Sequence, residues 1–511
     1  MPMTMRRLRA SAPTALALLP LALAAGGCSD PNGPQAVALE VSAPSEHLDV
    51  GQSLRLSAAP KDATGDPVRG GRIAWSSSDP AVAEVGAEGE VTGRAPGKVY
   101  VRAALGSVAD SVQLTVEDPV AALEVFPDSL FLVQGRPGRV YVEMRDAAGN
   151  PVAHSLSFAS SAAGTAAVDP SGEVRGASPG EATVTVTAGL RQVQVPVRVV
   201  TGERYRVRVL EGGPSSWVPF GINDRGEVVG WTLDGSEQSV LWRRGRVTEL
   251  GAGRAWAVND SGTVVLTEYQ APSQLRLVLW RDGRRELASG SLFSTLSGAP
   301  GSLVTHRAGI ARGDRVVVTA SFQLGPGAYS TRSALWTPQG LTVLPGHSPP
   351  ALNARGEVAI NRGEHRHTFL PMRALVWRNG DTTAVPQPRA GVDWWQISAI
   401  NDQGRAVGTY GVMSSGSPAA QGWYLWDGSS ATDLGALPGT PVAINDHGDI
   451  LGHDAERTVV VRGTRVVDLG EQLADWTIEG AFGINDLGQV VALGRHRATG
   501  QARTLLLTPA S

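Results

Sequence analysis

Beyond residue 30 the chain is patterned in short alternating segments. Runs rich in Val, Leu, Thr and Trp recur between Gly, Asn, Asp and Pro. Alternation with a period of two places every second side chain on one face of a strand, and the intervening residue types favour turns. Long apolar patterns with the helical period are hard to find. The pattern therefore predicts an all-β protein.

Length and composition narrow this picture. A chain of 511 residues is too long for one ordinary core, so we expect several domains. The 62 glycines and 33 prolines suit many tight turns. A formal net charge of -3 offers no broad basic field, so no nucleic-acid partner is expected.

The N-terminus has the pattern of an export signal. Three arginines, Arg6, Arg7 and Arg9, precede an apolar stretch at 12–23 that is too short for a comfortable membrane span. Small residues then lead to Cys28, the only cysteine, which excludes an intramolecular disulfide. A plain secretory signal with an incidental cysteine is the alternative.

Residues 1–28 resemble a bacterial lipoprotein signal. The resemblance implies that Cys28 is lipidated and becomes the first mature residue. Because Ser29 rather than Asp follows, it also implies an exported protein anchored at the cell surface, at the outer membrane, with the membrane as a partner through Cys28. Residues 29–36 are interpreted as a tether.

The next 170 residues or so contain an internal repeat. IAWSSS at 73–78 matches LSFASS at 156–161, and GEVTGRAPG at 89–97 matches GEVRGASPG at 172–180, a shift of 83 residues. Each copy holds several short alternating segments and has the length of a small β-sandwich. We therefore predict two immunoglobulin-like sandwiches, at 37–118 and 119–201, with Trp75 and Phe158 filling equivalent core positions.

The phrases WSSSDPAVAEV and GEVTGRAPGKVYV resemble the group 2 bacterial immunoglobulin-like domain. The second copy resembles it less closely. Members occur in surface adhesins and as spacers in exported proteins, so the resemblance implies a fold and leaves function open. The turns DATGDP at 62–67 and DAAGNP at 146–151 lack the acidic ladder of a calcium loop and are interpreted as hairpin turns.

The C-terminal part repeats the phrase Asn-Asp-x-Gly. The asparagine of the phrase recurs six times, and a degenerate copy at 309–318 gives seven units. The average spacing is about 44 residues, since 262 residues separate the first Asn from the last. A full unit holds four short apolar runs, which is typical of a propeller blade. In five units the third run ends in a tryptophan, which we expect to pack between neighbouring blades; these are Trp242, Trp280, Trp336, Trp377 and Trp426. The repeated asparagines are Asn223, Asn259, Asn353, Asn401, Asn445 and Asn485.

We therefore predict a β-propeller at 203–511 that is seven-bladed by this count, with six or eight blades left open by the irregular 262–309 region. The last unit lacks a fourth apolar run. Residues 204–211 precede the first unit and resemble the fourth run of a unit, but no first three runs come before them. We expect these ends to pair and close the ring. The repeated phrase is interpreted mainly as hairpin-turn chemistry, with a ligand or metal role as the alternative. The stretch at 433–452 resembles the HAF-repeat family of extracellular bacterial proteins, although the His-Ala-Phe triplet is absent; no enzymatic activity is generally assigned to that family.

Strand alternation predicts which face of the propeller binds. The first-to-second and third-to-fourth turns are short and share one face, while the long connections share the other. Aromatic residues on these connections suit a glycan or protein partner. Packing beneath their own loops is the alternative. They are Trp217, Trp231, Trp256, Tyr269, Tyr329, Trp394, Trp395, Tyr410 and Trp476.

The sequence was also searched for metal-binding and catalytic residues. His365 and His367 with Glu364 lack a further ligand cluster, so no metal site is predicted, and no cofactor motif or nucleophile motif is found. Loop carboxylates that could form a glycosidase pair are Glu364, Asp393, Asp475 and Glu479. The sequence favours a non-catalytic, lipid-anchored surface protein in which two spacers present a ligand-binding propeller. A polysaccharide hydrolase or lyase and a structural envelope protein remain the alternatives.

Overall fold

The structure is a computed structural model. It describes residues 35–201, 204–212, 217–271, 274–289, 296, 302–325, 328–347, 351–363, 365–366, 368–369, 372–414 and 417–510. The predicted signal, Cys28 and most of the tether lie outside these residues. No helix among them has the length and apolar character needed to cross a membrane. The chain divides into two compact units, one ending at Asp118 and one spanning Pro119–Ser511.

The first unit is a β-sandwich. Its main sheet has the order β2 (His47–Asp49), β9 (Val108–Glu117), β8 (Gly97–Leu105) and β5 (Ala74–Ser77). Two smaller sheets complete it: β3 (Ser53–Arg55), β7 (Glu90–Gly93) and β6 (Ala83–Val85), and the pair β1 (Ala38–Ser42) and β4 (Ser57–Lys61). In β8 the residues Val99 and Val101 are buried and Tyr100 between them is exposed. The alternation in the sequence thus reports the core side of the sheet.

A second sandwich with the same sheet order opens the second unit. Its main sheet is β11 (Leu130–Val133), β18 (Arg191–Val200), β17 (Gly180–Ala188) and β14 (Ser157–Ser160). Its smaller sheets are β12 (Pro137–Arg139), β16 (Glu173–Gly176) and β15 (Ala166–Val168), and the pair β10 (Ala122–Phe126) and β13 (Tyr141–Arg145). Phe158 and Trp75 both pack, half-buried, against their own cores, as the repeat predicts.

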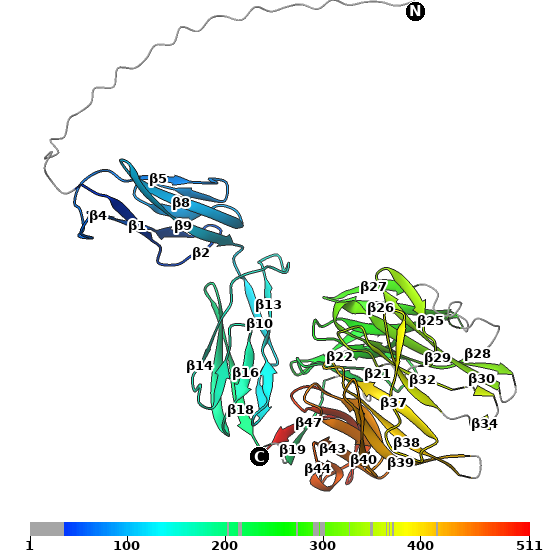
Figure 1. The fold of residues 1–511 in the computed structure, drawn as a ribbon. Coiled ribbons are helices and arrows are strands. Elements are labelled where there is room, and N and C mark those ends of the chain that lie inside the picture. Colours follow the sequence, from blue (N-terminus) through cyan, green and yellow to red (C-terminus); the bar gives the residue numbers. More distant parts are fainter. Residues whose placement is uncertain are drawn as a thin grey trace, which may run out of the picture. The chain divides into compact units, whose positions relative to one another are not determined.

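Seven small antiparallel sheets follow in the described part of the chain (Figure 1). The first sheet consists of β20 (Trp217–Ile222), β21 (Val228–Thr232), β22 (Gln238–Arg243) and β23 (Arg246–Ala252). The second consists of β24 (Arg254–Val258), β25 (Val264–Ala271), β26 (Gln274–Arg281) and β27 (Arg284–Ser289). The third consists of β28 (Ser302–Ile310), β29 (Val316–Gly325), β30 (Ala328–Thr337) and β31 (Gly340–Val343). The fourth is β32 (Val358–Arg362), β35 (Arg373–Arg378) and β36 (Asp381–Ala384), with the hairpin β33 (His365–Arg366) and β34 (Thr368–Phe369). Isolated bridges at His347 and Leu352 stand where the other sheets have a first strand.

The last three sheets complete the propeller. The fifth sheet consists of β37 (Trp394–Ile400), β38 (Ala406–Ser414), β39 (Ser417–Trp426) and β40 (Ala431–Gly435). The sixth consists of β41 (Thr440–Ile444), β42 (Ile450–His453), β43 (Thr458–Arg462) and β44 (Arg465–Asp468). The seventh consists of β45 (Trp476–Ile484), β46 (Val490–His496), β47 (Ala502–Ala510) and β19 (Arg204–Val209). Two 3₁₀ turns, η1 (Arg312–Asp314) and η2 (Gly470–Gln472), lie in connections. The all-β prediction of two sandwiches and a seven-sheet propeller is confirmed.

The start of the propeller closes its end. Strand β19 pairs antiparallel with β47, with Arg204 opposite Ala510 and Val209 opposite Leu505, and the two strands lie side by side in Figure 1. This is the pairing predicted from the missing fourth run of the last unit. It removes an open sheet edge that would otherwise template aggregation.

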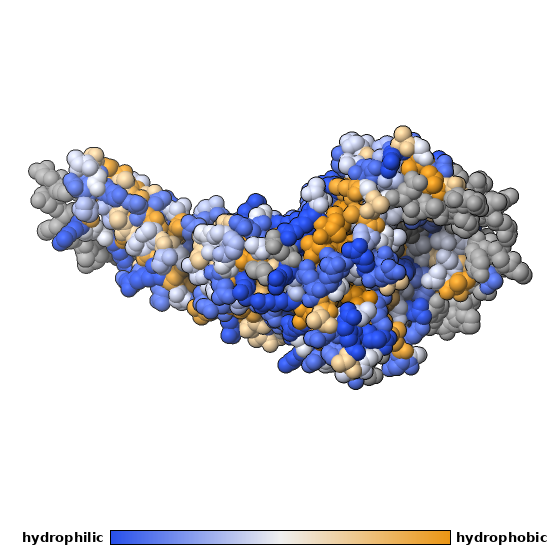
Figure 2. Space-filling model, turned by 90° about the horizontal axis from the view of Figure 1, so that it is seen from below, coloured by the Kyte–Doolittle hydropathy of each residue, from blue (hydrophilic) through white to orange (hydrophobic). Residues whose placement is uncertain are grey.

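In the five sheets that have one, the tryptophan at or near the end of the third strand packs between neighbouring sheets. Trp242 shares a hydrophobic cluster with Leu506 of β47, Trp377 with Leu335 of β30, and Trp426 with Val376 of β35. Each ring therefore contacts the cluster that joins its own sheet to the preceding one, as its recurrence predicts. On the face visible in Figure 2, hydrophilic residues separate smaller hydrophobic patches.

Candidate functional site

The repeated asparagines form a hydrogen-bonded ring at the inner turns. Within its own turn, the side-chain oxygen of Asn485 accepts the backbone N–H of Gln489 at 2.9 Å. Its amide nitrogen reaches into the next sheet and donates to the backbone carbonyl of Asn223 at 2.9 Å. The same bond joins Asn223 to Asn259 at 2.8 Å and Asn445 to Asn485 at 3.0 Å. All six asparagines are buried, so these bonds are shielded from water.

The aspartates of five phrases form a second, incomplete ring beside the first. In the fourth unit Ala354 stands in place of the aspartate, and its N–H donates to Asp402 at 2.6 Å. The backbone N–H of Asp446 donates to the carboxylate of Asp486 at 2.8 Å, and that of Asp486 donates to Asp224 at 2.7 Å. Asp224 donates in turn to Asp260 at 2.9 Å. In the degenerate third unit, Arg312 stands in place of the aspartate and pairs with Asp260 at 3.3 Å. The phrase is therefore architectural, because the amide of its asparagine donates to the next unit and the carboxylate of its aspartate accepts from the preceding unit.

These aspartates line a cavity of about 180 Å³ where the seven units meet. Burial, followed by the charge of neighbouring aspartates, raises the pKa of Asp446 and of Asp486 to about 6. The same causes raise the pKa of Asp224 well above its ordinary value. No group of three or more His, Cys, Asp or Glu side chains in the described residues is arranged to hold a metal ion.

The second sandwich is docked on this face of the propeller. Glu143 on β13 forms ion pairs with Arg225, in the first inner turn, and with Arg243 at 2.8 Å. On β13, Tyr141 lies near the aspartate ring: its pKa is raised first by burial and then by the charges of Asp224 and Asp260. The face formed by the short turns is thus an interface within the chain.

A second set of contacts belongs to the same interface. Arg136 pairs with the buried carboxylate of Asp449 at 2.6 Å, and Arg462 pairs with that carboxylate at 3.2 Å. The carbonyl of Pro137 lies 3.2 Å from Nε2 of His447. Leu487, the variable residue of the last phrase, packs in the core cluster of the sandwich. The sandwich is therefore part of the propeller's base and does not act only as a spacer.

Sequence reasoning missed this interface. Its residues occupy the variable position of the repeated phrase, namely Arg225, His447 and Leu487, where they differ because each meets a different part of the sandwich. A variable position inside an otherwise regular phrase was the one available signal.

Most of the predicted ligand-binding aromatics are buried. The six are Trp217, Trp231, Trp256, Trp394, Trp395 and Tyr410, each at most 9 % exposed. Trp476 is half-buried and packs edge-on against His496. The side chains of Tyr269 and Tyr329 lie outside the described ones. The structure therefore shows packing for the described rings, and their ligand-binding role stays a prediction.

The packing of these rings is specific. Phe220 stacks on Trp231 with ring centroids 3.8 Å apart, and Trp256 meets both rings edge-on. The indole of Trp256 donates to Thr267 at 2.7 Å, and burial lowers the pKa of the adjoining His306 to about 3. Trp231 and Trp256 lie on β21 and β24 and not on the long connections where they were expected, so these rings pack among strands and not beneath loops.

The other candidates from the sequence occupy ordinary structural roles where the structure describes them. Asp393 accepts the backbone N–H of Met413 at 2.7 Å, and Glu479 pairs with Arg495 at 2.5 Å. Glu364 and His367 lie outside the described residues. Asp62 and Asp146 accept backbone N–H groups within their own turns, which confirms the hairpin-turn interpretation.

Comparison with known proteins assigns one part of the chain. Residues 37–116 match the bacterial Ig-like domain (group 2), which confirms that resemblance for the first sandwich. The comparison with curated proteins gives no match.

Several solved structures are similar in part. Domains 4 and 5 of the S-layer protein SbsC share 23% identity, with 32% of this chain and 96% of that chain covered and a TM-score of 0.16. The β-propeller domain of the Trilobed protease from Pyrococcus furiosus shares 9% identity over 76% of this chain and 94% of that one, with a TM-score of 0.30. An acylaminoacyl peptidase from Pyrococcus horikoshii shares 9% identity over 57% of this chain and 51% of that one, with a TM-score of 0.40.

Proposed function

We propose that this is an exported, lipid-anchored and non-catalytic surface protein whose propeller binds an extracellular glycan or protein through its long connections. One observation supports the proposal above the others: the second sandwich covers the short-turn face through Glu143, Arg136 and Leu487. The face formed by the long connections is then the one left for a partner. Loops held on a rigid scaffold are common binding surfaces.

The docked sandwich makes this presentation rigid. Its contacts with the propeller include two buried ion-paired clusters, around Glu143 and around Asp449. The sandwich and the propeller would then lose little conformational entropy when a partner binds to the long connections, which favours affinity.

A glycan array tests the binding role. The protein lacking residues 1–28 is applied to the array, and any hit is then incubated with the protein and analysed for released products. Binding without turnover is the expected result. Released product would instead support the hydrolase or lyase alternative, and the absence of any hit would favour a structural envelope protein.

The binding face is located on the hit complex by hydrogen exchange. Protection is expected in the connection between β21 and β22, where Leu233 is 54% exposed. The short turn between β43 and β44 on the docked face, near the exposed Val466, serves as the internal control. Protection at Val466 alone would contradict the assignment of the binding face.

The anchor is tested separately with the full chain in a two-membrane bacterium. Cys28→Ser should move the protein from the membrane fraction to the soluble exported fraction, since stable anchoring requires more than one acyl chain. Ser29→Asp should retain the protein in the inner membrane. A soluble wild-type protein would show that the segment is a plain secretory signal.

A further inference from the structure

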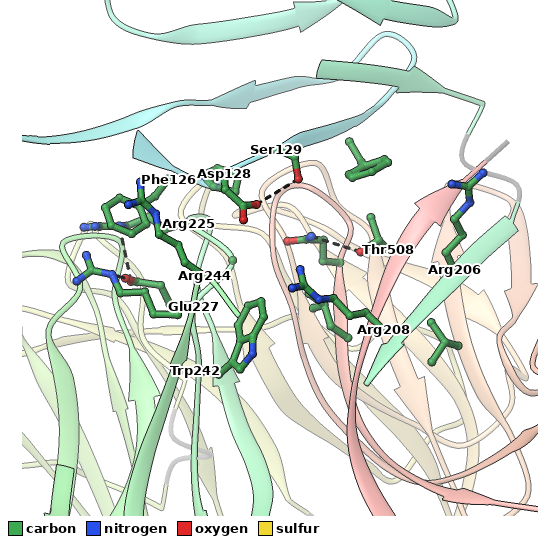
Figure 3. Close-up of a pocket in the computed structure, with 17 residues that line it drawn as sticks. Phe126, Asp128, Ser129, Arg206, Arg208, Arg225, Glu227, Trp242, Arg244 and Thr508 are labelled. Carbon is green, nitrogen blue, oxygen red and sulfur yellow. Dashed lines mark hydrogen bonds and ion pairs between the residues drawn. The ribbon is translucent and has the colours of Figure 1, made fainter. Parts of the chain in front are cut away.

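A second cavity lies where the docked sandwich meets the rim of the propeller, away from the long connections. It has a volume of about 330 Å³, within the range of small-ligand pockets of roughly 300–1,000 Å³. The segment that follows β10 forms one wall, and strands β19 and β47 with Trp242 form the other (Figure 3). All of these residues belong to one compact unit.

One side of the cavity is a set of arginines held by a single ring. The phenyl ring of Phe126 has three guanidinium groups against it, those of Arg225, Arg243 and Arg244, at 4.0, 4.1 and 4.2 Å from its centroid. Acidic partners neutralise these three cations. Glu143 and Glu227 pair with Arg225 and Arg243, and Glu124 lies 3.4 Å from Arg244.

The other side carries two cations that lack such neutralisation. Arg206 and Arg208 project from β19, are exposed, and have no acidic partner among the described residues. The guanidinium of Arg208 lies over Trp242 at 5.0 Å, which holds it in place by a cation–π contact. Asp128 is the one nearby acid left, and it accepts a hydrogen bond from Ser129 at 3.2 Å. The two free arginines therefore exceed the single free carboxylate by one positive charge.

The remaining lining is suited to a small amphipathic molecule. Apolar groups come from Phe131, Val207 and Leu506, while Gln489 and Thr508 offer an amide and a hydroxyl. Gln489 already donates to Thr508 at 3.4 Å, so both side chains are ordered toward each other. Planar guanidinium groups match carboxylate and sulfate oxygens in paired hydrogen bonds.

We propose that this cavity binds a short acidic saccharide. The carboxylate or sulfate of the sugar pairs with Arg206 and Arg208, and its ring lies against Phe131 and Val207. The hydroxyl groups of the sugar meet Gln489 and Thr508. This site is distinct from the long-connection face and does not depend on the proposed function of that face.

Calorimetric titration of the protein lacking residues 1–28 tests the proposal. The probes are trigalacturonate, a sulfated chondroitin disaccharide and neutral galactotriose. Saturable binding of either acidic probe, and none of the neutral one, is the expected result, and the acidic probe that binds identifies the anionic group. Absence of binding by both acidic probes, or equal binding of galactotriose, would overturn the proposal.

Two variants locate the site. The double substitution Arg206→Gln and Arg208→Gln should weaken binding at least tenfold. Arg204→Gln removes the same charge from the same strand but lies outside the cavity lining, so it should leave affinity unchanged. All three arginines are exposed, and unchanged melting temperatures would show that the fold is retained. Unaltered affinity in the double variant overturns the assignment, whereas the array hit on the long-connection face should persist in it.

Discussion

The side-chain amide of Asn485 donates a hydrogen bond to the backbone carbonyl of Asn223, 262 positions earlier in the chain, at 2.9 Å. This bond closes the ring of inner turns, just as the pairing of β19 with β47 closes the ring of sheets. The first and last units are therefore joined twice, once beside the axis and once at the rim. The repeated phrase takes part in this closure because its polar groups serve the neighbouring unit as well as their own.

Asn485→Ala should destabilise the propeller. The substitution removes the bonds that Asn485 makes to the N–H and the side-chain oxygen of Gln489 in a buried site, and each such loss costs about 1–3 kcal/mol. The carbonyl of Asn223 loses the bond across the ring but keeps the N–H of Gly226. We expect the free energy of unfolding, measured by urea denaturation, to fall by about 2–4 kcal/mol. Asn150→Ala, in an exposed hairpin turn, is the control and should change it by less than about 0.5 kcal/mol. Equal effects would show that the ring bonds add no stability.

Glu143→Gln should weaken the docking of the second sandwich. Arg225, 4% exposed, would lose a charged partner, and removing one member of a fully buried pair costs about 3–5 kcal/mol. Because Glu143 itself is 21% exposed, we expect a loss of about 2–3 kcal/mol. Limited proteolysis should also cut the segment after β18 faster.

Glu181→Gln provides the matched control for that experiment. Glu181 belongs to the same sandwich, is 77% exposed, and lies 3.9 Å from Arg198. Exposed pairs of this kind contribute little, so stability and proteolysis should match the wild type. Comparable losses in both variants would contradict a specific docking role for Glu143.

Asp486→Asn should change the pH dependence of stability. The pKa of Asp486 is raised to about 6 in the folded protein, from an ordinary value of 3.8. Between pH 7 and pH 5 the folded state therefore binds a proton that the unfolded chain does not bind, and this group stabilises the fold as the pH falls. The contribution is on the order of 1 kcal/mol per pH unit in that window.

The measurement is the difference between wild type and Asp486→Asn in urea denaturation at pH 7, 6 and 5. Burial lowers the pKa of His306, His447 and His453, so these groups act in the opposite direction and are common to both proteins. The amide oxygen of Asn can still accept the N–H of residue 446. We expect the variant to be the more stable at pH 7 and to lose that advantage by pH 5; a constant difference would refute the shift.

Gly408→Ala should lower the melting temperature. The second strand lies so close to the first that a Cβ at Gly408 would sit 1.9 Å from the backbone oxygen of Gln396. The close approach accompanies a register shift between Ile397 and Ala399. Overpacking of this kind typically costs about 1–3 kcal/mol. Gly164→Ala, where the Cβ would meet nothing within 4 Å, is the control and should leave the melting temperature unchanged.

Local patterns explain why much of the fold was predictable. Alternation in β8 marks which side chains enter the core, and the repeated phrase marks each inner hairpin. The pairing of β19 with β47 followed from counting runs, because the last unit lacked one strand and the start of the domain supplied it. Each of these features depends on residues that are close in the sequence or that recur at a regular spacing.

The candidate sites were harder to predict because burial depends on distant segments. Trp231 and Trp256 lie where a binding surface was expected, yet neighbouring inner strands cover them and bring Phe220 against both. The identity of an aromatic residue does not show whether its ring packs in the core or binds a ligand. Its exposure is set by packing from other sheets, which periodicity does not report.

The sequence by itself determined the sandwiches, the repeated propeller unit, the hairpin chemistry and the closing strand, since these follow from local turns and periodic apolar residues. Only the tertiary structure decided that the second sandwich covers the short-turn face, that most described aromatics are packed, and that a cationic cavity lies beside β19. The physical reason is that pairs such as Glu143 with Arg225 join residues far apart in the chain, and their approach depends on how whole domains pack.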